Sequence, residues 1–283
     1  MIKVFKLNDE YRDNIIALWQ ECFGDSKEYI SFFLDNCPDY VVVGYFVKQQ
    51  LVSMLFLLDG ELADKKCKYL YAACTHTEFR RQGIMECLIE SAKLYCTNND
   101  YSGIFLVPAD EKLYSYYSKF GFISSFVKKK LTLNSYNSDC FEASNCYDVQ
   151  VICDLKEKLL LNINGFKFKR SVLEYTVKEH LFNNGKIFIY NGEEGSVLAF
   201  YYKDKNDIIV KELLADFNIS TAFVQKQFSN KNAENIYILM PIVYNNKDIE
   251  EKYTKCGMCL PLDLEMKAFL DKDARLYAGM YLD

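Results

Sequence analysis

The sequence predicts an α/β protein made of two similar units in tandem, and three observations support this prediction. Helix-like and strand-like runs alternate over about the first 134 residues in the order α-α-β-β-β-α-β-α-β-β. A polar segment rich in Asn and Ser follows at 134–147. Beyond it, several signals of the first part recur in the same order. We therefore expect domains at 1–134 and 150–283, joined by a linker at 135–149.

The first two predicted elements are helices. Asn8 and Asp9 precede a run in which apolar residues recur at helical spacing as far as Phe23. Gly24-Asp25-Ser26 interrupts that run, and Asp25 is expected to cap the second helix rather than to attract an ammonium group. The second helix is expected to end at Cys37-Pro38, because the residue before a proline disfavours helical backbone.

The rest of the first unit alternates strands and helices. Lys48-Gln49-Gln50 is short enough to join the first two strands as a hairpin. The expected elements are strands at 41–47 and 51–58, a strand at about 67–75, a helix at 83–96, a short buried strand at 104–107, a helix at 112–119, and a strand pair from Gly121 to near Leu133.

Two sequence echoes indicate that the second unit repeats the first. The run IFLVP at 104–108 is echoed by YILMP at 237–241, and YSKFGF at 117–122 is echoed by YTKCGM at 253–258. Their shared order favours duplication. The alternative is a pair of unrelated α/β units that share a helix–glycine–strand turn.

Composition excludes several classes of protein. The chain has 283 residues, of which 50% are hydrophobic, which excludes a largely disordered chain. The net charge of −5 lacks the basic excess of nucleic-acid binders. No apolar run approaches the ~20 residues of a membrane span, and the N-terminus lacks the apolar core of a signal peptide. We expect a cytoplasmic protein with neither a nucleic-acid nor a membrane partner.

The eleven cysteines are expected to be reduced, as they usually are in the cytoplasm. Cys256-Gly-Met-Cys259 is the one tight pair, and it lacks the second pair or the histidines that a zinc site needs. The proposed repeat places both residues at core positions. No metal is therefore expected.

The segment at 69–85 carries the strongest chemical signal. It predicts a strand, a short basic loop, and a helix with Gly83 in its first turn. The first amides of a helix are unbonded and partly positive, and glycine lets a phosphate approach them. Arg80 and Arg81, two of the five arginines, add charged donors. This pattern favours a phosphate site; the alternative is an ordinary strand–helix turn with solvated arginines.

The loop sequence RRQGIM at 80–85 resembles the Arg/Gln-x-x-Gly-x-Gly/Ala motif of the GNAT N-acetyltransferase superfamily, with Met85 where most members have Gly or Ala. The run LYSYYSKFGF at 113–122 resembles a later motif of the same superfamily. The runs at 18–26 and 51–58 resemble the Eis-like subgroup. The resemblance covers about the first 134 residues and is weaker over the second half.

This resemblance implies an α/β fold with a mixed sheet, built as tandem GNAT-like domains with an acetyl-CoA-binding N-terminal domain and a degenerate C-terminal repeat. It also implies that two parallel strands, 67–75 and 104–107, splay apart and that the pantetheine arm pairs with the exposed backbone. The residues expected to bind acetyl-CoA are Cys74, Thr75 and His76 for the pantetheine, and Arg80, Arg81, Gln82, Gly83, Ile84 and Met85 for the pyrophosphate.

The implied chemistry is direct attack of an amine on the thioester, which requires no nucleophilic side chain. Tyr117 occupies the position at which the resemblance implies the acid that protonates the departing thiolate, and its reference pKa near ~10 suits that task. The alternative is an aromatic core face shared with Tyr114 and Tyr116. The general base is not assigned, and its candidates are His76, Asp283 with its terminal carboxylate, and water.

The second half lacks the phosphate loop. Its counterpart at 215–222 contains neither Gly nor Arg, and Asp216 would repel a phosphate. We expect a degenerate domain that helps to wall the acceptor site, together with Phe23, Asp25, Phe32 and Phe33. The predicted function is acetyl transfer to a primary amine of a small molecule or peptide. The alternatives are a non-catalytic acyl-CoA-binding or interaction protein and a tRNA-dependent aminoacyl transferase.

Overall fold

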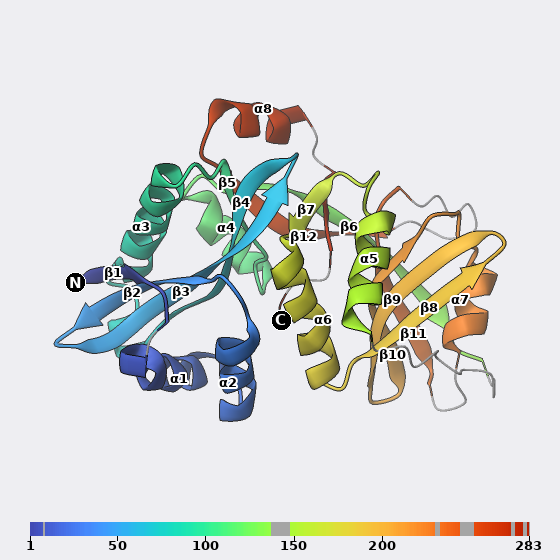
Figure 1. Cartoon of the computed structure of the whole chain (residues 1–283), viewed down its shortest axis with the longest axis horizontal. Coiled ribbons are helices and arrows are strands. Elements are labelled where there is room, and N and C mark those ends of the chain that lie inside the picture. Colours follow the sequence, from blue (N-terminus) through green and yellow to red (C-terminus); the bar gives the residue numbers. More distant parts are fainter. Residues whose placement is uncertain are drawn as a thin grey trace. The chain divides into compact units, whose positions relative to one another are not determined.

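The computed structural model describes residues 1–7, 9–136, 148–229, 233–243, 252–272, 275–279 and Leu282. The chain divides into two compact units made of alternating segments (Figure 1). Unit 1 consists of Met1–Ser125, Phe166–Tyr175 and Gly257–Ala274, and unit 2 of Phe126–Gly165, Thr176–Cys256 and Arg275–Asp283. The contiguous domains expected at 1–134 and 150–283 stay a prediction.

Unit 1 contains a mixed sheet, as the sequence predicts. Its strands follow the order β1-β2-β3-β4-β5-β12, and only the contact between β4 and β5 is parallel. A further strand, β7, pairs with the end of β3. The bounds are β1 (Ile2–Phe5), β2 (Val41–Val47), β3 (Gln50–Leu62), β4 (Lys65–Thr75), β5 (Gly103–Leu106), β7 (Gly165–Phe168) and β12 (Lys252–Pro261).

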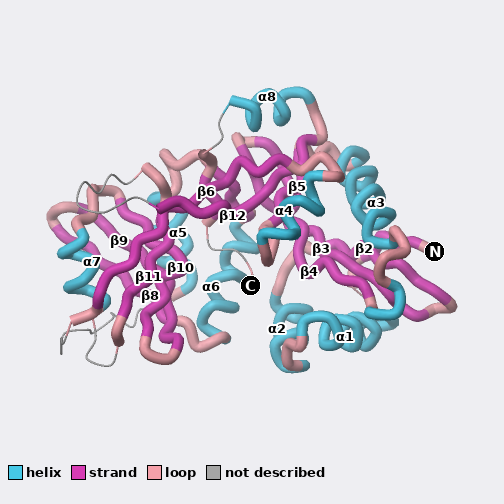
Figure 2. Tube along the Cα trace, turned by 180° about the vertical axis from the view of Figure 1, so that it is seen from behind, coloured by secondary structure: helices cyan, strands magenta, loops and turns pink. Residues whose placement is uncertain are grey.

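Helices cover both faces of this sheet because its strands are apolar on both sides. On one face, the rings of Trp19 in α1 and Phe33 in α2 pack against Phe56 and Tyr71 in tilted and edge-on contacts. On the other, α3 and α4 pack against a cluster that includes Leu55. Figures 1 and 2 show the two pairs of helices on opposite faces of the sheet. The helices are α1 (Asp9–Phe23), α2 (Lys27–Asn36), the 3₁₀ turn η1 (Thr77–Phe79), α3 (Ile84–Asn98), α4 (Glu111–Ser118) and α8 (Leu264–Lys272).

The strand pair expected between Gly121 and Leu133 is wrong. One long strand, β6 (Ile123–Asn134), occupies that range and pairs antiparallel with β11 (Asn235–Met240). The partner of β5 is instead β12. The three lysines at 128–130 resemble a polar turn, but Lys128 and Lys129 are buried within the strand, and Lys128 Nζ donates to the carbonyl of Gly279 at 3.1 Å.

Unit 2 repeats the order of unit 1. Strands β8, β9 and β10 are antiparallel, helix α7 follows, and β11 returns parallel to β10, as β2, β3, β4, α3 and β5 do. The bounds are α5 (Val149–Leu159), α6 (Arg170–Phe182, which begins in unit 1), β8 (Lys186–Gly192), β9 (Gly195–Asp204), β10 (Asp207–Ala215), α7 (Thr221–Phe228) and β13 (Tyr277–Ala278).

The repeat does not extend to every sequence echo. Tyr253, the expected counterpart of Tyr117, lies exposed in strand β12, whereas Tyr117 lies in helix α4. The two cysteines of the tight pair, Cys256 and Cys259, are buried in β12. Their core positions are therefore confirmed.

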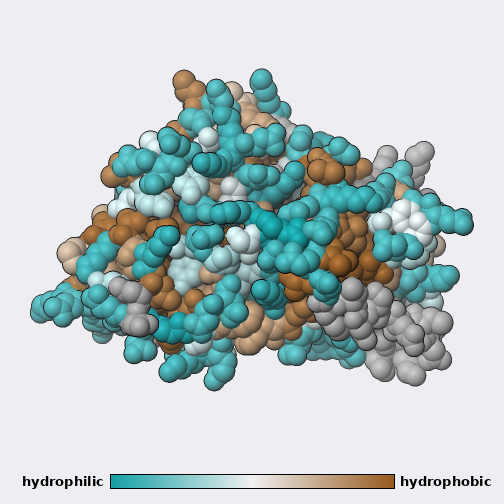
Figure 3. All heavy atoms as spheres, in the orientation of Figure 1, coloured by the Kyte–Doolittle hydropathy of each residue, from teal (hydrophilic) through white to brown (hydrophobic). Residues whose placement is uncertain are grey.

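The surface and the helix lengths agree with the composition. On the face that Figure 3 shows, hydrophilic side chains intermix with smaller hydrophobic groups. Among the described residues, no helix is both long and apolar enough to cross a membrane.

Candidate functional site

Strands β4 and β5 separate soon after they meet. Their parallel pairing runs only from Cys67 and Gly103 to Tyr69 and Phe105, while β4 continues to Thr75. The expected splay is thus present. A bulge accompanies it, because two residues of β4, Ala72 and Ala73, lie between successive pairs with β3, and Ala72 has a φ of +47°.

Helix α3 begins beside this free stretch. Its N-cap is Gly83, whose φ of +76° lies in the left-handed region. A Cβ added there would meet nothing within 4 Å, so backbone conformation rather than crowding favours glycine. Gly83 supplies no side-chain cap, and the first helical bond runs from the amide of Cys87 to the Gly83 carbonyl at 3.1 Å. The first amides of α3 therefore have no capping side chain at the N-cap and suit an anion.

Two arginines precede this helix start. Arg80 Nε donates to the Thr75 carbonyl at 2.9 Å, which holds the guanidinium over the end of β4. Arg81 has a φ of +62° and is a second left-handed residue of this loop, separated from Gly83 by Gln82. Met85 packs against the apolar core, which explains how the helix tolerates a large residue here.

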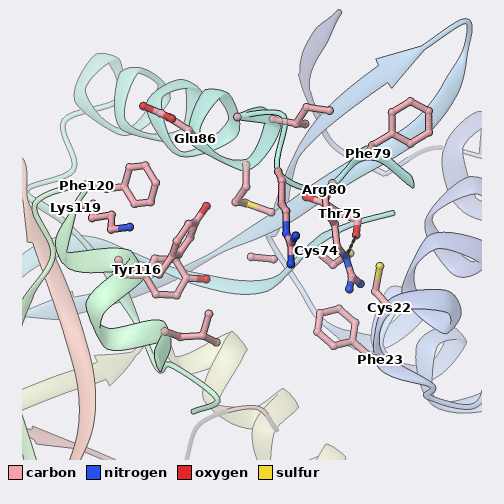
Figure 4. Close-up of a pocket in the computed structure, with 17 residues that line it drawn as sticks. Cys22, Phe23, Cys74, Thr75, Phe79, Arg80, Glu86, Tyr116, Lys119 and Phe120 are labelled. Carbon is pink, nitrogen blue, oxygen red and sulfur yellow. Dashed lines mark hydrogen bonds between the residues drawn. The ribbon is translucent and has the colours of Figure 1, made fainter. Parts of the chain in front are cut away.

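A cavity of about 670 Å³ in unit 1 joins the free end of β4 to the start of α3 (Figure 4). The predicted residues that line it are Cys74, Thr75, Arg80, Arg81, Gly83, Ile84, Met85 and Tyr117. The lining residues that sequence reasoning did not assign are Cys22, Ala73, Phe79, Glu86, Leu113, Tyr116, Lys119 and Phe120. Figure 4 shows α1 contributing Cys22 and Phe23 on one side and α4 contributing Tyr116 on the other.

The remaining predicted site residues, His76 and Gln82, do not line the cavity. His76 Nε2 lies 2.9 Å from the Glu21 carboxylate, and its Nδ1 accepts from the Glu78 amide at 3.3 Å. Because both ring nitrogens are engaged, His76 offers no lone pair to an acceptor amine, and the geometry does not support a base role. Gln82 Nε2 donates to the Glu78 carbonyl at 3.2 Å. Both side chains hold the loop together.

Glu21 is a loop anchor that sequence reasoning missed. The hydroxyl and the amide of Thr77 donate to its carboxylate at 2.7 and 3.1 Å, and these bonds hold the pKa of Glu21 below its ordinary value. The contact ties α1 to the loop that precedes α3. The sequence gives no signal for it, because the two residues are 56 positions apart.

Tyr117 combines burial with access to the cavity. Its residue is only 8% exposed, and its ring packs against Tyr116 and Phe122 with centroids 5.3 and 5.5 Å away. Burial raises the pKa of its phenol above the ordinary value, so the phenol keeps its proton at neutral pH. Tyr114 on the same helix is buried but does not line the cavity.

The expected acceptor residues separate into two groups. Phe23 lines the cavity and is 46% exposed. Asp25 is not the helix cap, because it accepts from Trp19 Nε1 at 2.7 Å while Ser26 caps α2 through the Tyr29 amide. Phe33 is fully buried in the aromatic core, and the neighbouring ring of Phe32 stacks on Tyr175, so neither lines the cavity.

The equivalent place in unit 2 is occupied by the protein itself. Ser220 caps α7, and its hydroxyl accepts from the Phe223 amide at 3.1 Å. Asp216 accepts from the Ser196 amide at 2.7 Å and lies 3.3 Å from Lys158. Beyond the last parallel pair of β10, the buried Glu212 accepts from the Tyr277 hydroxyl at 2.7 Å. A capped helix start beside an acidic side chain does not suit a phosphate.

Two further predictions concern a metal and the chain terminus. Among the described residues, no group of three or more His, Cys, Asp or Glu side chains is placed to hold a metal ion. Asp283, one of the candidates for the general base, lies outside the described residues.

A family model described as an acetyltransferase (GNAT) domain matches residues 3–124. No curated protein matches the chain. A conserved protein of Enterococcus faecalis, described as of unknown function and a probable N-acyltransferase, has a TM-score of 0.71 at 13% identity, covering 93% of this chain and 73% of that one.

Two other solved structures are similar over nearly the whole chain. Eis1 from Mycobacterium abscessus has a TM-score of 0.64 at 8% identity, covering 95% of this chain and 76% of that one. A tandem GNAT protein from the clavulanic acid biosynthesis pathway has a TM-score of 0.56 at 9% identity, covering 93% and 99%. At these identities the likenesses establish the fold alone.

Proposed function

We propose that the protein transfers an acetyl group from acetyl-CoA to a primary amine, because a family model described as an acetyltransferase (GNAT) domain matches residues 3–124. The observation that carries this proposal is the cavity, which joins an uncapped helix start, two arginines and a free strand edge. The helix start and the two arginines suit the pyrophosphate of acetyl-CoA, and the strand edge suits its pantetheine arm.

The pyrophosphate end is assigned to the start of α3. The first amides of that helix, the left-handed Gly83 and the guanidinium groups of Arg80 and Arg81 together supply backbone and charged donors in one loop. The free stretch of β4 that ends at Thr75 provides a backbone edge for the amide-bearing pantetheine arm. The fit therefore includes both charge and shape.

The reacting end is assigned to the region between β4 and α4. Acetyl-CoA supplies a thioester whose carbonyl a neutral amine attacks, releasing a thiolate. Tyr117 reaches the same cavity and retains its phenolic proton, so it is placed to donate that proton to the thiolate. Since His76 is fully hydrogen-bonded, we assign removal of the amine proton to water.

The acceptor is assigned to the side of the cavity formed by α1. Phe23 and Phe79 line that side and present aromatic rings to an entering molecule. Aromatic faces attract cations and cover apolar stems. A primary amine on an apolar carbon chain, from a small molecule or a peptide, fits such an entrance.

The experiment that tests this function measures release of CoA thiol from acetyl-CoA in the presence of a panel of primary amines. The panel holds an aminoglycoside, a polyamine, a free amino acid and a lysine peptide. We expect turnover with at least one amine, and strongly reduced turnover when Arg80 and Arg81 are both replaced by Gln. Arg12→Gln is the matched control, because Arg12 pairs with Asp35 outside the cavity. Acetyl-CoA binding with no turnover on any amine would favour the non-catalytic alternative.

A further inference from the structure

Two cysteine thiols meet at one end of the cavity. Cys22 lies in the last turn of α1 and Cys74 near the end of β4, and both line the cavity (Figure 4). Figure 4 shows the Cys22 sulfur pointing toward Cys74, and each thiol shifts the pKa of the other. Cys74 is 7% exposed, whereas Cys22 is partly exposed and so accessible from solvent.

The surroundings of Cys22 favour its thiolate. The neighbouring Cys74 thiol lowers the pKa of Cys22 most strongly, and the Arg80 guanidinium also lowers it. Burial and the negative charge of Glu21 oppose them. Together these contacts lower the pKa of Cys22 to about 7. A thiolate, rather than a thiol, is the reactive form of cysteine.

A second group of cysteines in unit 1 shows that proximity is not sufficient for reactivity. A Cβ placed on Gly103 would lie 3.1 Å from the Cys259 sulfur and 3.3 Å from the Cys67 sulfur, so these two thiols flank the same glycine. Both are fully buried, and so is Cys96. Burial raises the pKa of Cys67 and of Cys96 to about 12 and raises that of Cys259 as well. The neighbouring Cys22 thiol and burial also raise the pKa of Cys74, but Cys74 lines the cavity beside the accessible Cys22. The other three thiols do not line the cavity and are expected to be inert.

We propose that Cys22 and Cys74 form a redox-sensitive pair, at which a peroxide produces an intramolecular disulfide within the cavity. The Cys22 thiolate attacks one oxygen of the peroxide, forming a sulfenic acid and releasing hydroxide. Cys74 then attacks the Cys22 sulfur, loses its proton, and displaces water as the disulfide forms. Two thiols are oxidised by two electrons, and hydrogen peroxide is reduced to two waters.

The disulfide alters the site itself. It joins the last turn of α1 to the end of β4, and it removes the Cys22 thiolate that Arg80 contacts. This step rests on the proposed function, which assigns the end of β4 to the pantetheine arm. Oxidation is therefore expected to lower the affinity for acetyl-CoA, and a dithiol reductant to restore it.

The test uses the chain with Cys140 and Cys146 replaced by Ser. Any disulfide that forms then joins two of the nine cysteines whose positions the structure describes. The protein is treated with hydrogen peroxide, remaining thiols are alkylated, and peptides are mapped by mass spectrometry. We expect one cross-linked pair of peptides containing Cys22 and Cys74, with an intact mass lower by roughly 2 Da. Cys67, Cys96 and Cys259 are expected to react with the alkylating agent only after denaturation.

Matched variants separate the pair from other thiols. Cys22→Ser and Cys74→Ser should each abolish the cross-link, while Cys87→Ser, which removes an exposed thiol of α3 that does not line the cavity, should leave it unchanged. Oxidation of Cys22 to a sulfinic acid without a cross-link, or a cross-link to another cysteine, would overturn the proposal.

Titration with acetyl-CoA then tests the consequence. We expect the dissociation constant to rise about tenfold or more on oxidation and to return after reduction. A disulfide that leaves this constant unchanged would overturn its effect on the site. A protein that forms the disulfide but never binds acetyl-CoA would contradict the proposed function and leave the disulfide in place.

Discussion

At the residue scale, two glycines of the same geometry allow a controlled test of the phosphate loop. Gly83 and Gly24 both have a φ of +76°, and a Cβ on either would meet nothing within 4 Å. Gly83→Asp places a carboxylate at the start of α3, where it repels the pyrophosphate. We expect at least about a tenfold loss of acetyl-CoA affinity, or ~1.4 kcal/mol, by calorimetry.

Gly24→Asp is the matched control for that measurement. It carries the same backbone strain but lies at the end of α1, and it should leave the affinity nearly unchanged. Equal effects of the two substitutions would mean that backbone strain, and not charge at the cavity, explains the loss.

Tyr117→Phe removes one hydroxyl and keeps the ring that packs on Tyr116 and Phe122. If the phenol protonates the thiolate, kcat should fall by roughly 10²–10⁴-fold, while acetyl-CoA binding barely changes. Tyr114→Phe removes a phenol from the same helix outside the cavity and should retain activity. Wild-type kcat in the Tyr117 variant would assign the protonation to another group.

The reactivity of Cys22 should depend on pH in a defined direction. Its pKa of about 7, set by Cys74 and Arg80 against Glu21, means that the thiolate fraction rises as pH rises through 7. The rate of alkylation should therefore increase roughly tenfold between pH 6 and its plateau. Stopped-flow or timed mass spectrometry measures this rate. A profile with its midpoint above pH 8.5 would show that Cys74 and Arg80 do not lower the pKa of Cys22.

Sequence reasoning found the residues of the site that are local in the chain and missed those that are not. Arg80, Arg81 and Gly83 are consecutive or nearly so, and a helix start requires their pattern within a few residues. Cys22 and Glu21 reach the same loop from α1, more than fifty positions away. No periodicity in either segment encodes that contact.

At the element scale, the starts of α3 and α7 occupy the same position in the two units and differ in chemistry. Gly83 leaves α3 without a capping side chain, whereas Ser220 caps α7 and Asp216 precedes that cap in the same loop. Replacing Arg80 and Arg81 together by Gln should weaken acetyl-CoA binding strongly. Asp216→Asn should leave it unaffected, and calorimetric titration of both variants compares them. If Asp216→Asn lowers the affinity, acetyl-CoA binds near the start of α7 instead.

Strand faces were predictable from the sequence, but strand partners were not. The alternation in β6 indicates a strand, yet nothing in it indicates that the partner is β11, or that β12 completes the sheet beside β5. Lys128 and Lys129 of β6 are buried, although lysine side chains are ordinarily exposed, so their position also could not be predicted from residue type.

At the scale of the whole molecule, the duplicated strand order was predictable because each unit must bury the same pattern of apolar strands and helices. Both parallel strand pairs adjoin a bulge, at Ala72 and Ala73 in β4 and at Lys211 in β10. A shared fold does not imply a shared site. We therefore expect the residues at the two helix starts, rather than the fold, to decide which unit binds acetyl-CoA.

Calorimetric titration of acetyl-CoA into the protein tests most directly whether the cavity of unit 1 is its acetyl-CoA site. We predict a stoichiometry near one per chain, with the binding heat strongly reduced in Gly83→Asp and retained in Gly24→Asp. A stoichiometry near two, with one site lost when Lys203, Lys205 and Lys211 are replaced, would contradict this assignment. So would binding that survives intact in Gly83→Asp.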